Sequence, residues 1–316
     1  MAQNPLLTTA IPAELEEDHD STFGDIESST ASLRSSIYEH VYENGRRYHS
    51  FRAGQYVLPN DEAEQERLDL IHHLFTLTLK GNLCITKLEN PQNILDIGTG
   101  TGIWAIDIGD QYPTASVIGT DLSPIQPPWV PPNVRFEIDD CTDDWTFPLS
   151  HFDFIHIRTL GGSIKDWPAL LKRCYEHLKP GGHIEVAEGR TNFWTNDNTL
   201  PPDCALKQWL DGFHQYCSAA GIDFDVIPQM PAWLEKVGFK GIQTLDCPVP
   251  VGTWPKDPTL KKIGAVFRTH QYMAFESYAV ALFTRVGGWS ADDFQILIAK
   301  AREEMATNKL HIYTFT

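Results

Sequence analysis

Between residues 93 and 188 the chain alternates short apolar runs with longer segments in which apolar residues recur at helical spacing. The helical spacing covers 102–112 and 166–178, and the apolar runs occupy 93–97, 115–120, 133–138, 152–157 and 183–188. Short apolar strands separated by helices are typical of βαβ units, which build a parallel sheet covered by helices on both faces. The pattern therefore predicts an α/β fold with a doubly wound sheet.

Helical periodicity extends to both sides of this region. Ahead of it, the segment 60–79 is expected to form one helix, because Asn60 or Asp61 can cap it and acids fill its first turn. Behind it, we expect helices at 203–221, 228–239, 260–287 and 290–305, and strands at 239–251 and 309–316. The five prolines in 123–133 indicate a stiff surface loop rather than a linker between domains.

The composition narrows the classes of partner. The 316 residues include 25 Lys and Arg against 42 Asp and Glu, a net charge of −17, which argues against nucleic acid or a membrane surface as partner. Residues 1–36 hold seven acids and one arginine and are expected to form a flexible acidic tail. The six cysteines have neither CxxC nor zinc spacing, and the N-terminus lacks the features of a signal peptide. We therefore expect reduced thiols, a cytoplasmic location and no metal site.

The segment with the clearest chemistry is the glycine-rich turn at 98–102, which joins a strand to a helix. Such a turn brings a ligand against backbone N–H groups and a helix N-terminus. The spacing is G-x-G-x-G, with Ile103 where the dinucleotide fingerprint needs glycine, and no G-K-[ST] sequence follows. Asp96, two residues before the first glycine, would repel a pyrophosphate but suits a ligand that carries an ammonium group.

Further acids follow the next two strands. Asp121 ends the strand at 115–120, where an acid can accept hydrogen bonds from both ribose hydroxyls. Asp139 and Asp140 follow the strand at 133–138, in a position suited to an exocyclic amine. Acids at three successive strand ends suit a ligand with an amino acid, a ribose and an adenine, but no phosphate.

S-adenosylmethionine (SAM) is such a ligand, and the chain resembles the class I SAM-dependent methyltransferases, more narrowly their fungal LaeA-like group of secondary metabolism. The resemblance spans roughly 37–316 and is carried by segments 42–51, 54–73, 94–107, 119–133, 136–145, 152–158, 166–171 and 178–188. It implies SAM as cofactor, S-adenosylhomocysteine as product, and a set of cofactor-binding residues: Tyr48, Asp96, Gly98, Thr99, Gly100, Gly102, Asp121, Leu122, Asp139, Asp140, Cys141 and Arg158.

Within this set, the resemblance places the three glycines under the methionine part of SAM and Asp96 near its ammonium group. Asp121 is expected to accept from the ribose, Leu122 to pack on the adenine, and Asp140 to accept from the adenine amine. Asp139 could exchange roles with Asp140. Tyr48 and Tyr56 could close over the cofactor, and core packing is equally plausible for both.

The resemblance also implies an architecture. We expect a Rossmann-like sheet of seven strands, mostly parallel, with the strand at 309–316 inserted antiparallel beside 183–188. Residues 37–92 would form an N-terminal helical lid, and 93–316 the SAM-binding domain, with inserted helices at about 190–238 as a cap. The acidic tail at 1–36 lies outside the resemblance.

Methyl transfer from a sulfonium is an in-line displacement, so orientation and exclusion of water supply much of the acceleration. A general base is needed only where the acceptor keeps its proton at neutral pH. The catalytic residue therefore stays unassigned. His156 is a candidate, although a packed strand histidine is the more common case. Glu188 is a second candidate, and His183 is disfavoured because it begins its strand, opposite the cofactor end.

The acceptor pocket is expected between the lid, the loop after 183–188 and the inserted helices at 203–235. Aromatic residues are frequent there, and most are expected to be core: Phe193, Trp194, Trp209, Phe213, Trp233 and Trp254. A pocket lined by some of them would fit a planar or hydrophobic molecule. We expect methylation of a small secondary metabolite on O, N, S or C. The alternative is a LaeA-like regulator that acts through protein partners or protein methylation, with a nuclear location possible.

Overall fold

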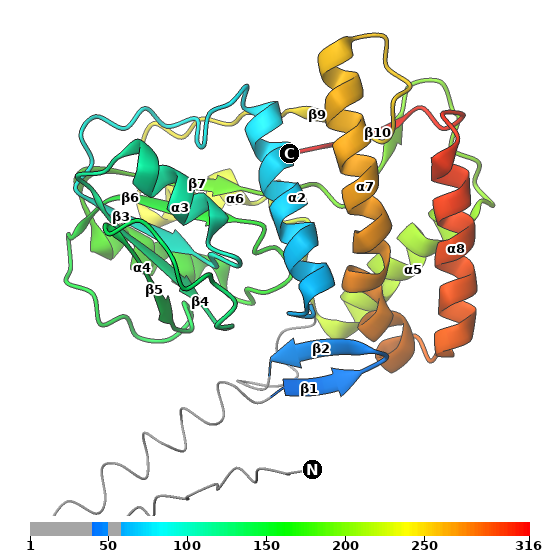
Figure 1. Ribbon diagram of the computed structural model, residues 1–316, viewed down its shortest axis with the longest axis horizontal. Coiled ribbons are helices and arrows are strands. Elements are labelled where there is room, and N and C mark those ends of the chain that lie inside the picture. Colours follow the sequence, from blue (N-terminus) through cyan, green and yellow to red (C-terminus); the bar gives the residue numbers. More distant parts are fainter. Residues whose placement is uncertain (1–39, 50–57) are drawn as a thin grey trace, which may run out of the picture.

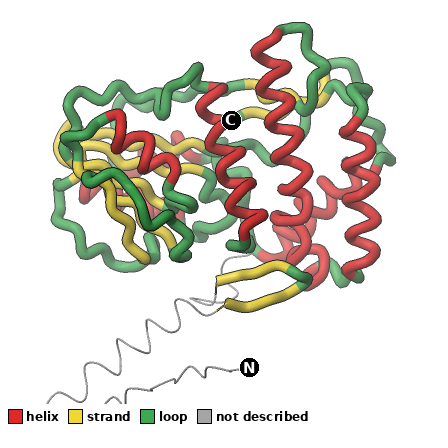
Figure 2. The backbone as a smooth tube through the Cα atoms, in the orientation of Figure 1, coloured by secondary structure: helices red, strands yellow, loops and turns green. Residues whose placement is uncertain are grey.

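The computed structural model describes residues 40–49 and 58–316, and Figures 1 and 2 show their arrangement. A central sheet with flanking helices lies beside a layer of longer helices (Figure 1). The acidic tail expected at 1–36 and the lid residue Tyr56 lie outside the described residues. Within the part described, no helix combines the length and apolar character needed to cross a membrane.

The central sheet has five strands, all parallel, in the order β5-β4-β3-β6-β7. They are β3 (Asn93–Ile97), β4 (Ser116–Asp121), β5 (Val134–Ile138), β6 (Phe152–Arg158) and β7 (Leu178–Ala187). From β3 the chain runs outward to β4 and β5 and then returns to place β6 on the other side of β3. In open α/β sheets, the carboxyl ends of the strands at such a reversal form the ligand crevice.

Helices cover both faces of this sheet, as predicted. On one face α3 (Ile103–Gln111) packs Trp104 and Ile108 against Ile94 and Phe154. On the other face α4 (Trp167–His177) and α6 (Met230–Val237) pack against the alternate strand residues, such as Leu95. Burial of alternate residues on two faces explains why the strands are almost continuously apolar.

The second layer is helical and has its own apolar core. It contains α2 (Glu62–Thr78), α5 (Ala205–Ala220), α7 (Pro258–Ala281) and α8 (Ala291–Ala306), and α7 continues into a π-helical turn, η1 (Leu282–Val286). Asp61 caps α2 by accepting from the Glu64 N–H at 3.0 Å, one of the two caps predicted. The layer is larger than the insert expected at 190–238, because α2, α7 and α8 share its core.

Three predictions about the strands are wrong. Within the described residues the central sheet has five strands rather than seven, and of the segment 239–251 only β9 (Pro248–Pro250) is a strand. The last strand, β10 (Ile312–Phe315), does not lie beside β7. It pairs antiparallel with β9 and with β8 (Trp194–Thr195) in a separate sheet. Ile312 is fully buried in the core of the helical layer, which satisfies the alternating pattern at this second location.

The predicted N-terminal lid is only partly helical. Its described part begins with a hairpin of β1 (His40–Glu43) and β2 (Arg46–His49), turned at Asn44-Gly45, and continues with α2. Asn-Gly favours such turns because both residues tolerate positive φ. The guanidinium of Arg46 binds both carboxylate oxygens of Asp61, at 2.6 and 2.9 Å, and so fastens the hairpin to the start of α2.

Candidate functional site

The glycine turn after β3 depends on backbone geometry that favours glycine. Gly98, Gly100 and Gly102 have φ of +69°, +58° and +79°, the left-handed region that other residues avoid. A Cβ on Gly98 would lie 2.5 Å from the Cδ2 atom of Leu160, and one on Gly102 would overlap the ring of Phe136. The glycines therefore let the turn pack tightly against these side chains, and the N–H groups of Thr99, Gly100 and Gly102 are bonded within the strand ends and the turn.

Asp96 is held rigidly below this turn. It is buried, and its carboxylate accepts from the Thr99 hydroxyl at 2.6 Å and from the His156 Nδ1–H at 2.7 Å. The His156 ring is itself only 1 % exposed and stacks on Trp104 with 3.7 Å between ring centroids. His156 thus contacts Asp96 and Trp104 but lines neither of the two cavities described, a geometry that favours positioning over proton transfer to a substrate.

Asp121 lies at the next strand end and is bonded to the glycine turn. Its two carboxylate oxygens accept from the backbone N–H of Gly100 at 2.8 Å and of Ser123 at 2.9 Å. Burial raises the pKa of Asp121 to about 6. Each oxygen keeps a free lone pair, so the carboxylate can still accept from two hydroxyl groups. Leu122, beside it, is half-buried.

The acids after β5 are linked to this strand end. The Asp139 N–H donates to the Asp121 carbonyl at 3.0 Å, and the Asp139 side chain accepts from the Asp140 N–H at 2.9 Å. Asp140 is buried and accepts from the N–H and hydroxyl of Thr142, whereas Asp139 is partly exposed. Burial raises the pKa of the Cys141 thiol to about 12, which keeps it uncharged at neutral pH.

Arg158 forms a polar chain that the sequence did not reveal. Its Nη2 donates to Nδ1 of His72 at 3.1 Å, and the His72 Nε2 lies 3.0 Å from Asp107. Since guanidinium can only donate, His72 Nδ1 must accept and its proton sits on Nε2. Burial and the charge of Arg158 lower the pKa of His72, and burial lowers that of Arg158 to about 10. The guanidinium lies 5.3 Å above the ring of Phe75.

Tyr48 has no described contact with the strand-end residues of the candidate cofactor site. Its buried ring lies under the guanidinium of Arg285, 5.7 Å away, on the turn that continues α7. The phenol oxygen has no hydrogen-bond partner among the described residues, and burial raises its pKa to about 12. Closure of Tyr48 over a cofactor stays a prediction.

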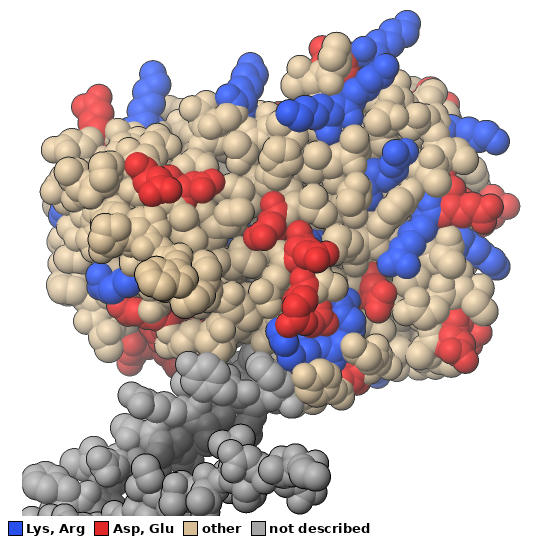
Figure 3. Space-filling model, in the orientation of Figure 1, with Lys and Arg blue, Asp and Glu red and all other residues tan. Residues whose placement is uncertain are grey.

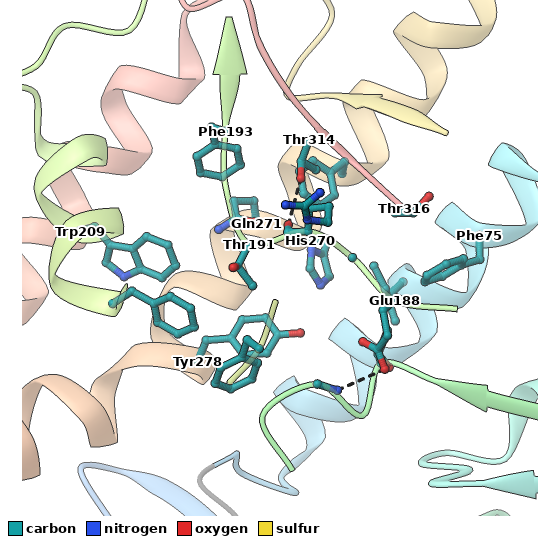
Figure 4. Close-up of a pocket in the computed structure, with 18 residues that line it drawn as sticks. Phe75, Glu188, Thr191, Phe193, Trp209, His270, Gln271, Tyr278, Thr314 and Thr316 are labelled. Atoms are coloured by element: carbon teal, nitrogen blue, oxygen red, sulfur yellow. Dashed lines mark hydrogen bonds between the residues drawn. The ribbon is translucent and has the colours of Figure 1, made fainter. Parts of the chain in front are cut away.

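A cavity opens between the sheet and the helical layer (Figure 4). It offers about 100 Å³ of space to the centres of water-sized molecules. Residues from α2, α5, α7, β10 and the loops after β6 and β7 line it, and its apolar walls are largely aromatic: Ile71, Phe75, Phe193, Trp209, Phe213, Phe224, Phe267 and Tyr278. Of the aromatics singled out in the sequence, Phe193, Trp209 and Phe213 line this cavity. Trp194, Trp233 and Trp254 do not.

Glu188 is the main acid of this cavity. One carboxylate oxygen accepts from the backbone N–H of Leu160 at 2.6 Å and of Gly161 at 3.1 Å. Burial raises its pKa to about 8, so the group holds a proton up to neutral pH and can exchange it there. His183, the other base candidate, lies within β7 rather than at its start as predicted, because the strand begins at Leu178. It is exposed and outside the aromatic cavity.

The cavity and the glycine turn are neighbours. Leu160 packs its side chain against Gly98 and donates its N–H to Glu188. Thr159 and Gly161, on either side of it, line the cavity. The loop that packs on the glycine turn therefore also forms part of the cavity wall.

A Rossmann-like sheet, a G-x-G-x-G turn and acids at three strand ends define a protein that binds an adenosyl ligand without phosphates. Residues 70–244, just over half of the chain, match the methyltransferase domain family. The chain belongs to this family, in its class I, LaeA-like group, and is a SAM-dependent methyltransferase. The residues fit SAM: each carboxylate oxygen of Asp121 accepts one backbone N–H and can accept a further hydrogen bond from a ribose hydroxyl.

Relatives with curated names come from fungi. The chain is 44% identical over 302 residues to methyltransferase PytC of Aspergillus terreus, covering 95% of this chain and 93% of that protein. It is 37% identical over 278 residues to secondary metabolism regulator LAE1 of Cochliobolus heterostrophus, covering 86% and 91%. A solved structure, phosphoethanolamine N-methyltransferase 2 of Haemonchus contortus with S-adenosylhomocysteine, matches at TM-score 0.44 and 15% identity, covering 93% and 73%.

Proposed function

We propose that the protein transfers the methyl group of SAM to a small secondary metabolite bound in the aromatic cavity. The observation that carries the proposal is the position of this cavity. Thr159 and Gly161 line it, Leu160 between them packs on Gly98 of the glycine turn, and its walls are largely aromatic. The names of the relatives, a methyltransferase and a regulator of secondary metabolism, support the class of acceptor. The acceptor atom, O, N, S or C, is left open.

In this proposal the strand-end residues hold the cofactor. Asp96, fixed by His156 and Thr99, faces the ammonium group, and Asp121 accepts from the ribose. Asp140 accepts from the adenine amine, and its burial favours it over Asp139 for this role. Leu122 and Cys141 pack against the adenine, and Arg158 borders the methionine part.

When bound, SAM supplies an activated methyl group on its sulfonium. The chain's part is to orient the acceptor, to exclude water and, for an acceptor that keeps its proton, to remove that proton. Glu188 is suited to the last task, because burial raises its pKa to about 8, near the working pH. His156 positions Asp96, and α2, with the hairpin attached to it, covers the site as the lid.

The experiment is methyl transfer from SAM with a labelled methyl group, offered to a metabolite extract and a protein extract from a fungus. We expect label in the small-molecule fraction. Asp121→Asn should lower incorporation by weakening SAM binding, whereas the matched variant Asp110→Asn, an exposed acid at the end of α3, should leave it unchanged. Incorporation equal in all three proteins, or none in either extract, would contradict the proposal.

The alternative is a regulator that acts through a protein partner or protein methylation, favoured by the name of the LAE1 relative. Label confined to a protein band, or a partner that co-purifies only when residues 1–36 are present, would support it. All six cysteines are free thiols, which supports the cytoplasmic location we propose and is equally compatible with the nuclear one. On the face drawn in Figure 3, Lys and Arg are dispersed rather than gathered into a stripe, which favours neither nucleic acid nor a membrane surface as partner.

A further inference from the structure

One face of α7 brings two polar side chains to the aromatic cavity. His270 and Tyr278 both line it, and both lie within hydrogen-bond distance of the same atom, Nη1 of Arg67 on α2. The distances from Nη1 are 2.8 Å to Nε2 of His270 and 3.2 Å to the hydroxyl of Tyr278. Figure 4 shows the imidazole of His270 inside the ring of lining residues, with Tyr278 and Glu188 nearby.

Arg67 is fixed by its own partner. Its Nε and Nη2 donate to the two carboxylate oxygens of Glu64 at 2.9 and 2.6 Å, and both side chains are almost fully buried. This bidentate pair fixes the plane of the guanidinium. Nη1 is thereby directed at the two residues of α7.

The contact with Arg67 sets which nitrogen of His270 carries the proton. Guanidinium only donates, so Nε2 of His270 accepts, and the neutral ring must then hold its proton on Nδ1. Burial, and next the charge of Arg67, hold the pKa of His270 well below its usual range, so the ring does not gain a second proton. His270 is 4 % exposed, and its Nδ1 has no hydrogen-bond partner among the described residues. A buried N–H donor in this state lacks an acceptor.

Tyr278 is oriented by the same cation. Its oxygen accepts from Arg67, which leaves its own proton free to donate. Burial raises its pKa, so the phenol stays protonated. The aromatic cavity thus contains two neutral donors, and Glu188, which also lines it, holds a proton of its own up to neutral pH.

We propose that the acceptor substrate is a planar, largely apolar molecule whose carbonyl or enol oxygen accepts a hydrogen bond from Nδ1–H of His270. Tyr278 supplies a second donor to the same part of the molecule. This inference rests on the proposed function and specifies its substrate class. The aromatic walls select the planar skeleton, and the unpaired donor selects the oxygen, because a ligand without an acceptor leaves that donor unpaired.

The first test compares two probes in the wild-type protein, 1-indanone and indane, which share a planar bicyclic skeleton and differ by the ketone oxygen. Binding is measured by ligand-observed NMR titration in the presence of SAM. We expect 1-indanone to bind on the order of tenfold more tightly, because its oxygen pairs a buried donor. Equal affinities, or no binding of either probe, would overturn the proposal.

Two variants then separate the donor from the packing of the ring. His270→Asn keeps an N–H near the position of Nδ1 and gives up the contact with Arg67. His270→Gln keeps an acceptor for Arg67 and gives up the Nδ1 donor. We expect the preference for 1-indanone to survive in the first variant and to disappear in the second, with SAM affinity unchanged in both. The opposite pattern would refute the assignment.

The experiments distinguish a failure of the proposed function from a failure of the proposed donor site. If no small molecule takes up label from SAM while the preference for 1-indanone holds, the proposed function is wrong and the donor site stands. If label enters a metabolite and the preference is absent, the donor site alone is wrong.

Discussion

Replacing Glu188 by glutamine should make the protein more stable at alkaline pH and less active. The amide of the new side chain can keep the oxygen that accepts from the N–H groups of Leu160 and Gly161, so the loop after β6 keeps its anchor. The amide also resembles the protonated form of the acid that burial favours. The substitution therefore removes an ionisation and little else.

The size of the effect follows from linkage between protonation and folding. Burial raises the pKa of folded Glu188 to about 8, against an ordinary value of 4.5. Between these pH values the unfolded chain has lost the proton and the folded chain still holds it, so stability falls as pH rises. For one such group the loss is about 2 kcal/mol between pH 6 and pH 8, and it levels off above the folded pKa.

Urea unfolding of the wild type and of Glu188→Gln, at pH 4, pH 6 and pH 8, measures this difference. At pH 4, below both pKa values, the two proteins should be similar, which serves as the internal control. Above it the variant should be the more stable protein, and its advantage should grow by about 2 kcal/mol between pH 6 and pH 8. Parallel stability curves across this range would show that Glu188 is not the buried proton carrier. Unchanged methyl transfer by a well-folded variant would exclude Glu188 as the base.

Three further predictions concern the cofactor site. Gly98→Ala should cost about 2–5 kcal/mol by urea unfolding, because left-handed strain adds to overlap with Leu160, whereas Gly45→Ala, in open space, should cost only about 1–2 kcal/mol. SAM affinity, measured by calorimetry, should fall as pH drops below about 6, because Asp121 then gains a proton, and Asp121→Asn should bind weakly with no such dependence. Asp96→Asn should lower stability by about 1–3 kcal/mol by leaving a buried imidazole without its anionic partner, and thermal unfolding checks this.

Local sequence patterns were enough to predict most helices and strands and part of the candidate cofactor site. The cap of α2 at Asp61 and the five parallel strands follow from residues close in sequence. Asp121 and the glycine turn could be paired in advance, because carboxyl ends of parallel strands meet at one edge of a sheet. The hydrogen bond from the Gly100 N–H to Asp121 shows that the two strand ends do meet there.

Two of the failures concern pairing between distant segments. The alternation in 309–316 predicts one buried face but not what buries it, and β10 satisfies it against the helical layer. The contact of Arg67 with His270 joins residues 203 positions apart, on two helices whose own patterns predict only apolar faces. No local signal distinguishes His270 from an ordinary packed histidine.

The buried pair of Glu64 and Arg67 contributes more to arrangement than to stability. Removing two charges from water is costly, and apolar residues of the same volume often serve a fold equally well. Apolar residues cannot orient His270 and Tyr278. Arg67 fixes the tautomer of His270 and leaves the hydroxyl proton of Tyr278 free to donate. The pair is explained if the cavity must recognise an oxygen atom, and it is unexplained if the cavity only encloses apolar surface.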